Sequence, residues 1–447
     1  MIKLNKNKIK ILGGGPAGIA LAHYLAKENI KFDLFEASNQ IGGNAKTLKF
    51  DKFYFDTGAH RWHDKNPTIT NEIKKIIGKG FQRVTAPSKI YWNNKLINFP
   101  LTPINLFRSL PFKILIKILI ENFKKLFKTN DLSNFESMVY SQYGRTLSNL
   151  FLTNYSEKLW GLESAKLVTQ ISGNRLKGLS ARNLLKELIY KSKFEKHLDG
   201  SFYYPRDGFG SIFSSIINNI DNNYIHLNSP ITRIFHHHNK ITKIQINNNI
   251  MDINDEKIVS TLPINVLIGM LSPHPPKLIL DITKSIKFRG LLLTIIQLDK
   301  PRFSENASIY FPEKDLPFNR IYEPKNRSSK LAPADQTCIV VESSLNQYDV
   351  RNTDTDDFLK KIKKSLLEIN LIKQEEILNS KTIKLNYAYP IMDIESKEKI
   401  EVILKYLKAF KNINFVGRNS LFEYTHTHNL FEEAETFVKK YTNPNYI

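Results

Sequence analysis

Three glycines near the N-terminus have the spacing of a loop that binds a pyrophosphate. Gly13, Gly15 and Gly18 follow a short apolar run and precede a stretch with helical periodicity. Glycines so placed permit a tight turn, a close backbone approach to phosphates and close packing of the helix, whose N-terminus adds N–H donors. Glu36 ends a second apolar run, where an acid can accept hydrogen bonds from a ribose. An ordinary βα turn shares the glycine pattern, but the helix, strand and acid together favour a dinucleotide site.

A second glycine pair, Gly42–Gly43, is followed by Asp56-Thr57-Gly58. With the first motif, this stretch resembles the FAD-binding start of the amine-oxidase-like flavoproteins. That superfamily includes monoamine oxidases, protoporphyrinogen oxidases, phytoene desaturases and UDP-galactopyranose mutases. The resemblance implies FAD as the cofactor. Many members carry an arginine after the glycine pair, whereas this chain has Asn44.

Further segments resemble the UDP-galactopyranose mutases of that superfamily. These are 58-GAHRWH, 155-YSEKLWG, 203-YYPRDGFGSIF and 417-GRNSLFEYTHTHNLFEEA. A group of bacterial FAD-dependent amine oxidoreductases from polysaccharide clusters is closer still, because it shares the type and order of 89-KIYWNNKLINFPLTPIN, 175-RLKGLS and 387-YAYPIMD. The chain departs from the mutases at Leu179, where they have a second arginine, and at His426 and His428, where they have acids.

The resemblance implies a role for each residue that matches a family motif. The residues expected to hold FAD are Gly13, Gly15, Pro16, Ala17, Gly18, Glu36, Gly42, Gly43, Asn44, Gly58, Ala59, His60, Gly417 and Arg418. The expected substrate-binding residues are Tyr155, Trp160, Arg175 and Tyr424. The expected catalytic residues are His60, His63, Arg175 and Tyr424. The competing interpretations are a histidine satisfied within its own turn, aromatic residues of a core and a surface salt bridge.

The elements that position these motifs are expected to form an α/β protein. Its Rossmann-like (GR2-type) FAD-binding domain would carry inserted helical and mixed-sheet substrate domains, and 447 residues suit two or three lobes. The expected FAD-binding domain is discontinuous and consists of residues 1–65, 201–265 and 385–447. We expect a mostly helical substrate domain at 66–200 and a β-rich substrate domain at 266–384.

Two local patterns predict β-structure with turns. Residues 88–101 predict a hairpin that turns at Asn93–Asn94. Residues 225–262 alternate like a β-meander and end in an apolar return strand. The three histidines at 236–238 fall at a predicted turn of this meander. Because adjacent strand residues face opposite ways, they do not converge on one ion, and we expect no metal site.

Residues 112–128 combine apolar side chains at helical spacing with lysines. We expect this helix to pack on its own domain, because it is apolar nearly all round. The alternative is a helix on a membrane surface, attracted by anionic lipid. No apolar stretch reaches the roughly 18 residues that span a bilayer.

The chain is strongly basic, with 65 lysines and arginines against 43 acids and a net charge of +22. The charge is spread along the chain and no nucleic-acid-binding motif accompanies it, so we expect an anionic small-molecule substrate and no nucleic-acid partner. The single cysteine, Cys338, excludes a disulfide framework and a cysteine-based zinc site. The N-terminus has the pattern of a strand and not of a signal peptide. We therefore expect the protein to be in the cytoplasm. The oligomeric state stays open.

These patterns together predict an FAD-dependent oxidoreductase of the amine-oxidase superfamily that acts on a sugar nucleotide or a polysaccharide precursor. The alternative is a UDP-galactopyranose mutase, in which reduced flavin acts as a nucleophile without net redox change. An oxidoreductase would instead use the flavin as a hydride acceptor. Two further alternatives are a porphyrinogen or polyene oxidase and a flavin-binding protein without turnover.

Overall fold

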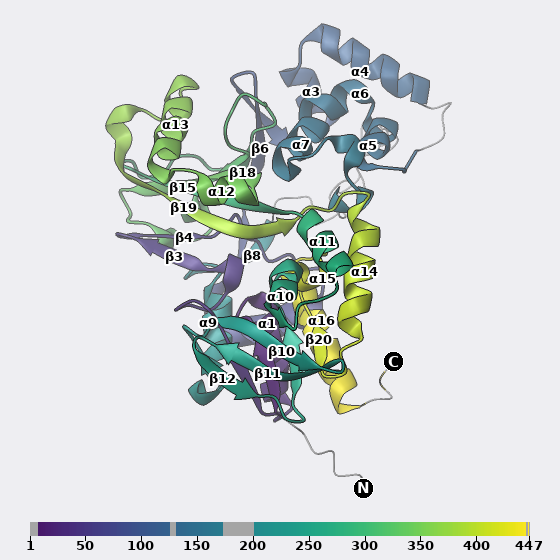
Figure 1. Ribbon diagram of the computed structural model, residues 1–447. Coiled ribbons are helices and arrows are strands. Elements are labelled where there is room, and N and C mark those ends of the chain that lie inside the picture. Colours follow the sequence, from purple (N-terminus) through teal and green to yellow (C-terminus); the bar gives the residue numbers. More distant parts are fainter. Residues whose placement is uncertain (1–7, 126–130, 173–200, 444–445, 447) are drawn as a thin grey trace.

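The computed structural model describes residues 8–125, 131–172, 201–443 and 446. In Figure 1 the two ends of the chain lie in the lower half of the molecule, around a parallel sheet that includes residues 9–12 and 413–415. The upper half holds a larger sheet, drawn mostly in green, and a group of helices drawn in blue. The mixed α/β fold predicted above is confirmed.

Five parallel strands form the sheet on which the first glycine loop stands. Their order is β20 (Ile413–Phe415), β13 (Lys257–Ser260), β1 (Ile9–Leu12), β2 (Phe32–Phe35) and β9 (Ile225–His226). Within it, Ile9 lies opposite both Lys257 and Phe32, so β1 is central. All residues of β1 and β2 are buried, as expected of parallel strands covered on both faces.

Helices cover one face of this sheet and a second sheet covers the other. The helices are α1 (Pro16–Lys27), α9 (Ser211–Ile217) and α16 (Thr427–Thr442). The covering sheet has the order β12 (Asn249–Asp252), β11 (Lys240–Ile246), β10 (Ile231–His237) and β14 (Leu271–Ser272). Its first three strands are antiparallel, and β13 then runs beside β1, which confirms the predicted meander and return strand. His238 and Asn239 make the turn with positive φ values of 44° and 58°.

A seven-stranded sheet forms the upper half of the molecule. Its order is β19 (Ile377–Pro390), β15 (Phe288–Leu298), β18 (Thr337–Asn346), β17 (Arg320–Tyr322), β16 (Ser308–Tyr310), β6 (Ser88–Trp92) and β7 (Lys95–Phe99). The last two strands are the predicted hairpin, and Asn93 and Asn94 form its turn with positive φ values. This hairpin extends the sheet, because β6 pairs in parallel with β16, and its Ile90 and Ile97 also pack in the apolar core of the neighbouring helices. β19 likewise extends to Pro390, past the position where the FAD-binding domain was expected to resume.

Each face of the larger sheet has its own cover. The helices α12 (Gln347–Asn352) and α13 (Thr355–Glu368) pack on one face. The hairpin β3 (Thr47–Phe50) and β4 (Phe53–Asp56) packs against the other, with Phe53 and Phe55 buried against β15 and β18. Since β3 and β4 follow directly after the second glycine turn, this contact joins the glycine loops to the larger sheet.

The helices of the upper half share a separate apolar core. They are α3 (Pro103–Ser109), α4 (Phe112–Lys125), α5 (Phe135–Tyr143), α6 (Arg145–Leu147) and α7 (Asn154–Trp160), with a π-helical turn at Ser148–Thr153. α4 buries Ile118 in this core but exposes Phe112, Leu119 and Phe123. The helix therefore packs on its own domain, as expected, but through one side only. Among the described helices, none is both long and apolar enough to cross a membrane.

The remaining elements connect these units. They are α2 (Pro67–Ile77), β5 (Phe81–Thr85), β8 (Ser201–Pro205), α10 (Ile264–Met270), α11 (Lys277–Ser285), α14 (Ser396–Lys408) and α15 (Arg418–Leu421). β5 pairs with β8, which brings the chain back toward the parallel sheet. Each of the larger sheets contains strands from distant parts of the chain. The division into domains by residue range stays a prediction.

The contact of α1 with the turn before it leads to a stability prediction. A Cβ on Gly18 would lie 1.9 Å from the carbonyl oxygen of Gly13, so α1 must move away from the turn to admit a side chain. We expect Gly18→Ala to lower the free energy of unfolding by about 1–3 kcal/mol in urea denaturation. Gly269→Ala is the control, because a Cβ there meets nothing within 4 Å in α10, and it should raise stability by up to ~1 kcal/mol. Equal effects of the two substitutions would contradict the close packing.

Candidate active site

The first glycine loop leaves the end of β1 and begins α1. Gly13 has a φ of +107° and Gly15 is the N-cap of α1, with Pro16 in the first turn. No side chain caps this helix and its first turn holds no acid, so its N–H groups and positive dipole end are free of a side-chain anion. A Cβ on Gly15 would approach only Gly43, at 3.9 Å. The loop thus offers open backbone to an anion, which fits a pyrophosphate.

The second glycine turn packs directly on the first. The Gly42 N–H donates to the Gly14 carbonyl oxygen at 2.8 Å. A Cβ on Gly43 would lie 3.0 Å from the Gly15 Cα, and Gly43 itself has a positive φ of 52°. Only glycine therefore allows this approach, and the two turns form one backbone surface.

Glu36 lies beside this surface at the end of β2. Its carboxylate accepts hydrogen bonds from the Gly14 N–H at 2.9 Å and from the N–H and hydroxyl of Ser38. A carboxylate has about four lone-pair positions, so it can still accept a bond from a ribose hydroxyl. This arrangement fits the expected role of Glu36.

The C-terminal motif, which begins at Gly417, packs against the start of α1. Gly417 has a φ of +100°, and a Cβ there would lie 2.7 Å from the Cβ of Ala17 in α1. The Arg418 guanidinium donates to the Thr425 carbonyl at 2.8 Å and lies over the rings of Tyr389 and Tyr424. In the structure, the N–H groups of Arg418 donate to carbonyl groups of the protein. The expected contact of Arg418 with the flavin stays a prediction.

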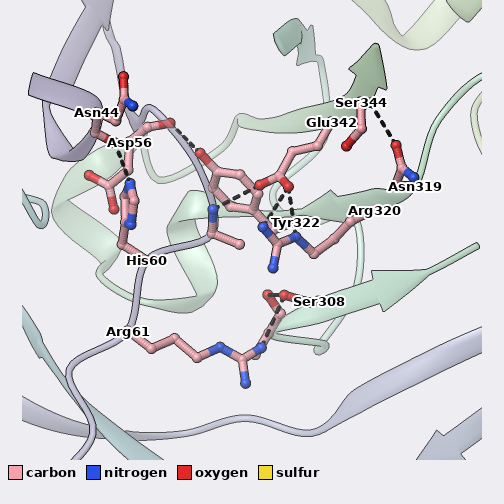
Figure 2. A network of polar contacts seen from close by, with 12 residues as sticks. Asn44, Asp56, His60, Arg61, Ser308, Asn319, Arg320, Tyr322, Glu342 and Ser344 are labelled. Carbon is pink, nitrogen blue, oxygen red and sulfur yellow. Dashed lines mark hydrogen bonds and ion pairs between the residues drawn. The ribbon is translucent and has the colours of Figure 1, made fainter. Parts of the chain in front are cut away.

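The loop after β4 carries Gly58, Ala59 and His60. The His60 Nε2 lies 2.8 Å from the Asn44 carbonyl oxygen (Figure 2). The His60 ring also stacks on Phe209. Burial, together with the nearby guanidinium of Arg418, lowers the pKa of His60 to about 3. The imidazole is therefore neutral at physiological pH. His60 thus joins the loop to the second glycine turn, whose Asn44 also donates to the Tyr387 carbonyl of β19.

His63 belongs to a different group of rings. It contacts His426 edge to face at 6.2 Å between centroids, and His426 stacks on His428 at 5.7 Å. His426 also contacts Tyr424. The two histidines that replace family acids thus lie together with His63 beside Tyr424.

A buried ion pair links the Gly58 loop to the larger sheet (Figure 2). The Arg320 Nε lies 2.8 Å from a Glu342 carboxylate oxygen, between adjacent strands β17 and β18. The other oxygen of Glu342 accepts the Ala59 N–H at 2.8 Å. Sequence analysis missed this pair. The only signal was a carboxylate in the otherwise apolar run 337-TCIVVESSLN.

Tyrosines gather around the two guanidinium groups. We name this group the tyrosine–arginine cluster, and it consists of Tyr155, Tyr310, Tyr389, Tyr424, Arg320 and Arg418. Tyr155 meets Tyr310 edge to face, and Tyr389 meets Tyr424. Each member is partly buried, which leaves part of each side chain accessible. Burial raises the pKa of Tyr155 well above its usual range, so its hydroxyl stays protonated and can donate.

Trp160 supports this cluster from the helical side. It is only 3% exposed and contacts Tyr389 and Tyr424 edge to face. Its predicted stacking on a base stays a prediction, and the structure places its ring in the apolar core. The Arg289 guanidinium holds this end of α7 on the sheet, since it donates to the Leu159 carbonyl at 2.9 Å and to the Ser344 carbonyl at 2.7 Å.

A buried polar group lies beneath the Gly58 loop. Asp56 accepts hydrogen bonds from the hydroxyls of Thr47 and Tyr204 and from the Phe209 N–H. Burial raises the pKa of the Asp56 carboxyl. Tyr322 donates to the Asp56 carbonyl, which ties the loop to β17. These contacts hold the Gly58 loop in place. Two residues singled out in the sequence, Arg175 and Leu179, lie outside the described residues.

The comparisons with known proteins agree with this geometry. A sequence profile of the family described as flavin containing amine oxidoreductase matches residues 16–355. Among curated proteins, the dTDP-fucopyranose mutase of Escherichia coli is 26% identical over 217 residues, which cover 47% of this chain and 54% of the mutase. Polyamine oxidase 5 of rice (Oryza sativa subsp. japonica) is 24% identical over 60% of this chain and 53% of the oxidase. The chain thus spans about half the length of these curated relatives.

One solved structure has the same fold over nearly the whole chain. It is a reduced UDP-galactopyranose mutase, with a TM-score of 0.85, 19% identity, and coverage of 99% of this chain and 96% of that one. At this identity the likeness shows the fold alone.

The open backbone at Gly15 leads to a prediction about the cofactor. We expect Gly15→Asp to abolish FAD binding, because a carboxylate would stand against the pyrophosphate. The measurement is the visible flavin absorbance of the purified protein and the FAD released on denaturation. Gly269→Asp is the matched control, since it adds the same charge at an exposed position of α10. Stoichiometric FAD in Gly15→Asp would overturn the assignment of the loop.

The low pKa of His60 leads to a prediction about pH. Since the unfolded chain binds this proton near pH 6.5 and the folded protein only near pH 3, stability falls as the pH drops through that interval. We expect His60→Gln to make this fall shallower in urea unfolding of the FAD-free protein. His274→Gln, at an exposed position, should keep the wild-type slope. An unchanged slope in His60→Gln would show that His60 is protonated normally.

Proposed function

Because the chain belongs to the family of flavin-containing amine oxidoreductases, we propose that it acts on a nucleotide-linked sugar. As a member of this family the chain is an FAD-dependent enzyme. The glycine loops fit the cofactor, since they present uncapped N–H groups and a ribose-binding carboxylate. We also propose the cytoplasm as its compartment, because the one cysteine, Cys338, is a buried free thiol.

The observation that carries this proposal is the tyrosine–arginine cluster. It lies at the Gly58 loop, because Glu342 bonds both Arg320 and Ala59. Guanidinium groups and protonated tyrosine hydroxyls bind phosphate oxygens, and the aromatic rings suit a sugar or a base. An apolar polyene carries no anionic group for these guanidinium groups and hydroxyls to bind.

Two reactions fit this substrate. The likeness to the E. coli dTDP-fucopyranose mutase supports a ring-contracting mutase. Beside Tyr424, however, this chain has His426 and His428 where the mutases have acids. This departure from the mutase motif leaves a net oxidation as the second reaction. When bound, FAD would supply either a nucleophile or a hydride acceptor.

The chain's own residues would orient the substrate in both reactions. Tyr155 and Tyr424 would donate to the diphosphate, while Arg320 and Arg418 would balance its charge. Neutral His60 would hold the flavin-side loop in place through Asn44 without adding charge. Trp160 and Arg289 would position Tyr155 by fixing α7 on the sheet.

The test uses the purified FAD-loaded enzyme with UDP-galactopyranose and with dTDP-fucopyranose. A mutase would convert the pyranose to the furanose only in the reduced state, without consuming the reductant. An oxidoreductase would lose its oxidised-flavin absorbance when the sugar nucleotide is added without oxygen. If neither compound alters the flavin spectrum or is converted in either redox state, the proposed substrate class is wrong.

A matched pair of variants tests the cluster. We expect Tyr424→Phe to weaken binding of the sugar nucleotide about tenfold, because one hydrogen bond to the diphosphate is lost. Its FAD content should stay unchanged. Tyr348→Phe is the control, since that tyrosine is 76% exposed on α12 and is not a member of the cluster. Equal affinity in both variants would remove Tyr424 from the substrate site.

A further inference from the structure

An exposed apolar stripe runs along α4 in the helical part of the upper half. Phe112, Leu119 and Phe123 are 69%, 68% and 65% exposed, and Ile116 and Ile120 are also exposed. Phe112, Ile116, Leu119 and Phe123 follow one another at steps of three or four residues, with Ile120 next to Leu119, so these side chains share one side of the helix. Isolated exposed apolar residues are ordinary, but a continuous stripe of this length marks an interaction surface.

The neighbouring helix extends the stripe. Ile104 and Phe107 of α3 are 57% and 70% exposed. α3 ends at Ser109 and α4 begins at Phe112, so the two helices follow each other with only two residues between them. Figure 1 shows α4 at the outer edge of the molecule, away from both sheets. We name the exposed residues of α3 and α4 together the apolar face.

A row of basic side chains borders this face. Lys113, Lys117 and Lys124 recur at helical spacing on one flank of the stripe, and all three are exposed. Arg108 adds a further exposed cation at the end of α3. The one acid of α4, Glu121, faces inward, where it accepts hydrogen bonds from the N–H and hydroxyl of Thr146. Glu121 is only partly exposed, so the fully exposed charges in the described part of these two helices are all positive.

We propose that the apolar face docks on an anionic lipid bilayer. Aromatic and aliphatic side chains beside lysines are the composition of a helix that lies in the membrane interface. The apolar residues would enter the acyl boundary, while the lysines extend toward anionic headgroups. The contact is peripheral, because no described helix is built to span a membrane.

Charge favours a bilayer over a second copy of this chain. A symmetric contact between two copies would place the two lysine rows close together without acids to pair with them. Such like-charge contacts are unfavourable in an interface. An anionic bilayer supplies the opposite charge and an apolar layer at once. This proposal does not depend on the substrate or on the reaction.

The test measures co-sedimentation of the full-length, FAD-loaded protein with vesicles. We expect binding to vesicles of about two parts phosphatidylcholine to one part phosphatidylglycerol and much weaker binding to phosphatidylcholine alone. High salt should reduce the bound fraction, because it screens the lysines. Equal binding to the two compositions, or no binding to either, would overturn the proposal.

Variants separate docking from misfolding and from self-association. We expect Leu119→Glu combined with Phe123→Glu to reduce vesicle binding at least about tenfold. Leu278→Glu is the control, because Leu278 is also 65% exposed but lies on α11. All variants should retain their flavin absorbance, which shows that they fold. If the double variant instead converts a dimer to a monomer in light scattering, with vesicle binding unchanged, the face is a contact between copies and the proposal fails.

Discussion

Contact between backbone segments without intervening side chains is the constraint on which the cofactor site depends. The first glycine loop lies against α1 at Gly18 and against the second turn at Gly43, and the C-terminal motif lies against Ala17 of α1 at Gly417. At each contact a Cβ would meet a neighbouring atom at 3.0 Å or less. The backbone surface proposed to bind the phosphates therefore exists only where these segments lie against each other. Because they come from both ends of the chain, the site is a product of the whole fold and not of a local motif.

A second constraint fixes the distance between the cofactor loops and the larger sheet. Glu342 uses one carboxylate oxygen for the Ala59 N–H and the other for Arg320. A buried charge pair of this kind costs desolvation free energy, and the loss of one partner leaves the other uncompensated. The β3–β4 hairpin adds apolar contact at the same junction through Phe53 and Phe55. The polar and apolar contacts together hold the two halves of the site in one geometry.

Much of this fold could be predicted because its signals are local. The glycine loops, the meander and the hairpin at Asn93–Asn94 each depend on a few neighbouring residues, and the positive φ values of those asparagines follow from their types. The Arg320–Glu342 pair could not be predicted, because the register of β17 and β18 alone brings it together. The sequence of α4 was ambiguous for another reason. Apolar residues lie on both sides of this helix, so its sequence does not indicate which side packs against the core.

The order of strands in the parallel sheet has a consequence for how the protein is made. β1 is synthesised before β13 and β20, which complete its sheet and come much later in the chain. α16, which packs on α1, is later still. N-terminal segments usually fold first during synthesis, but here β1 and α1 must wait for partners from the other end of the chain. The parallel sheet that carries the first glycine loop is therefore complete only after β20 has been synthesised.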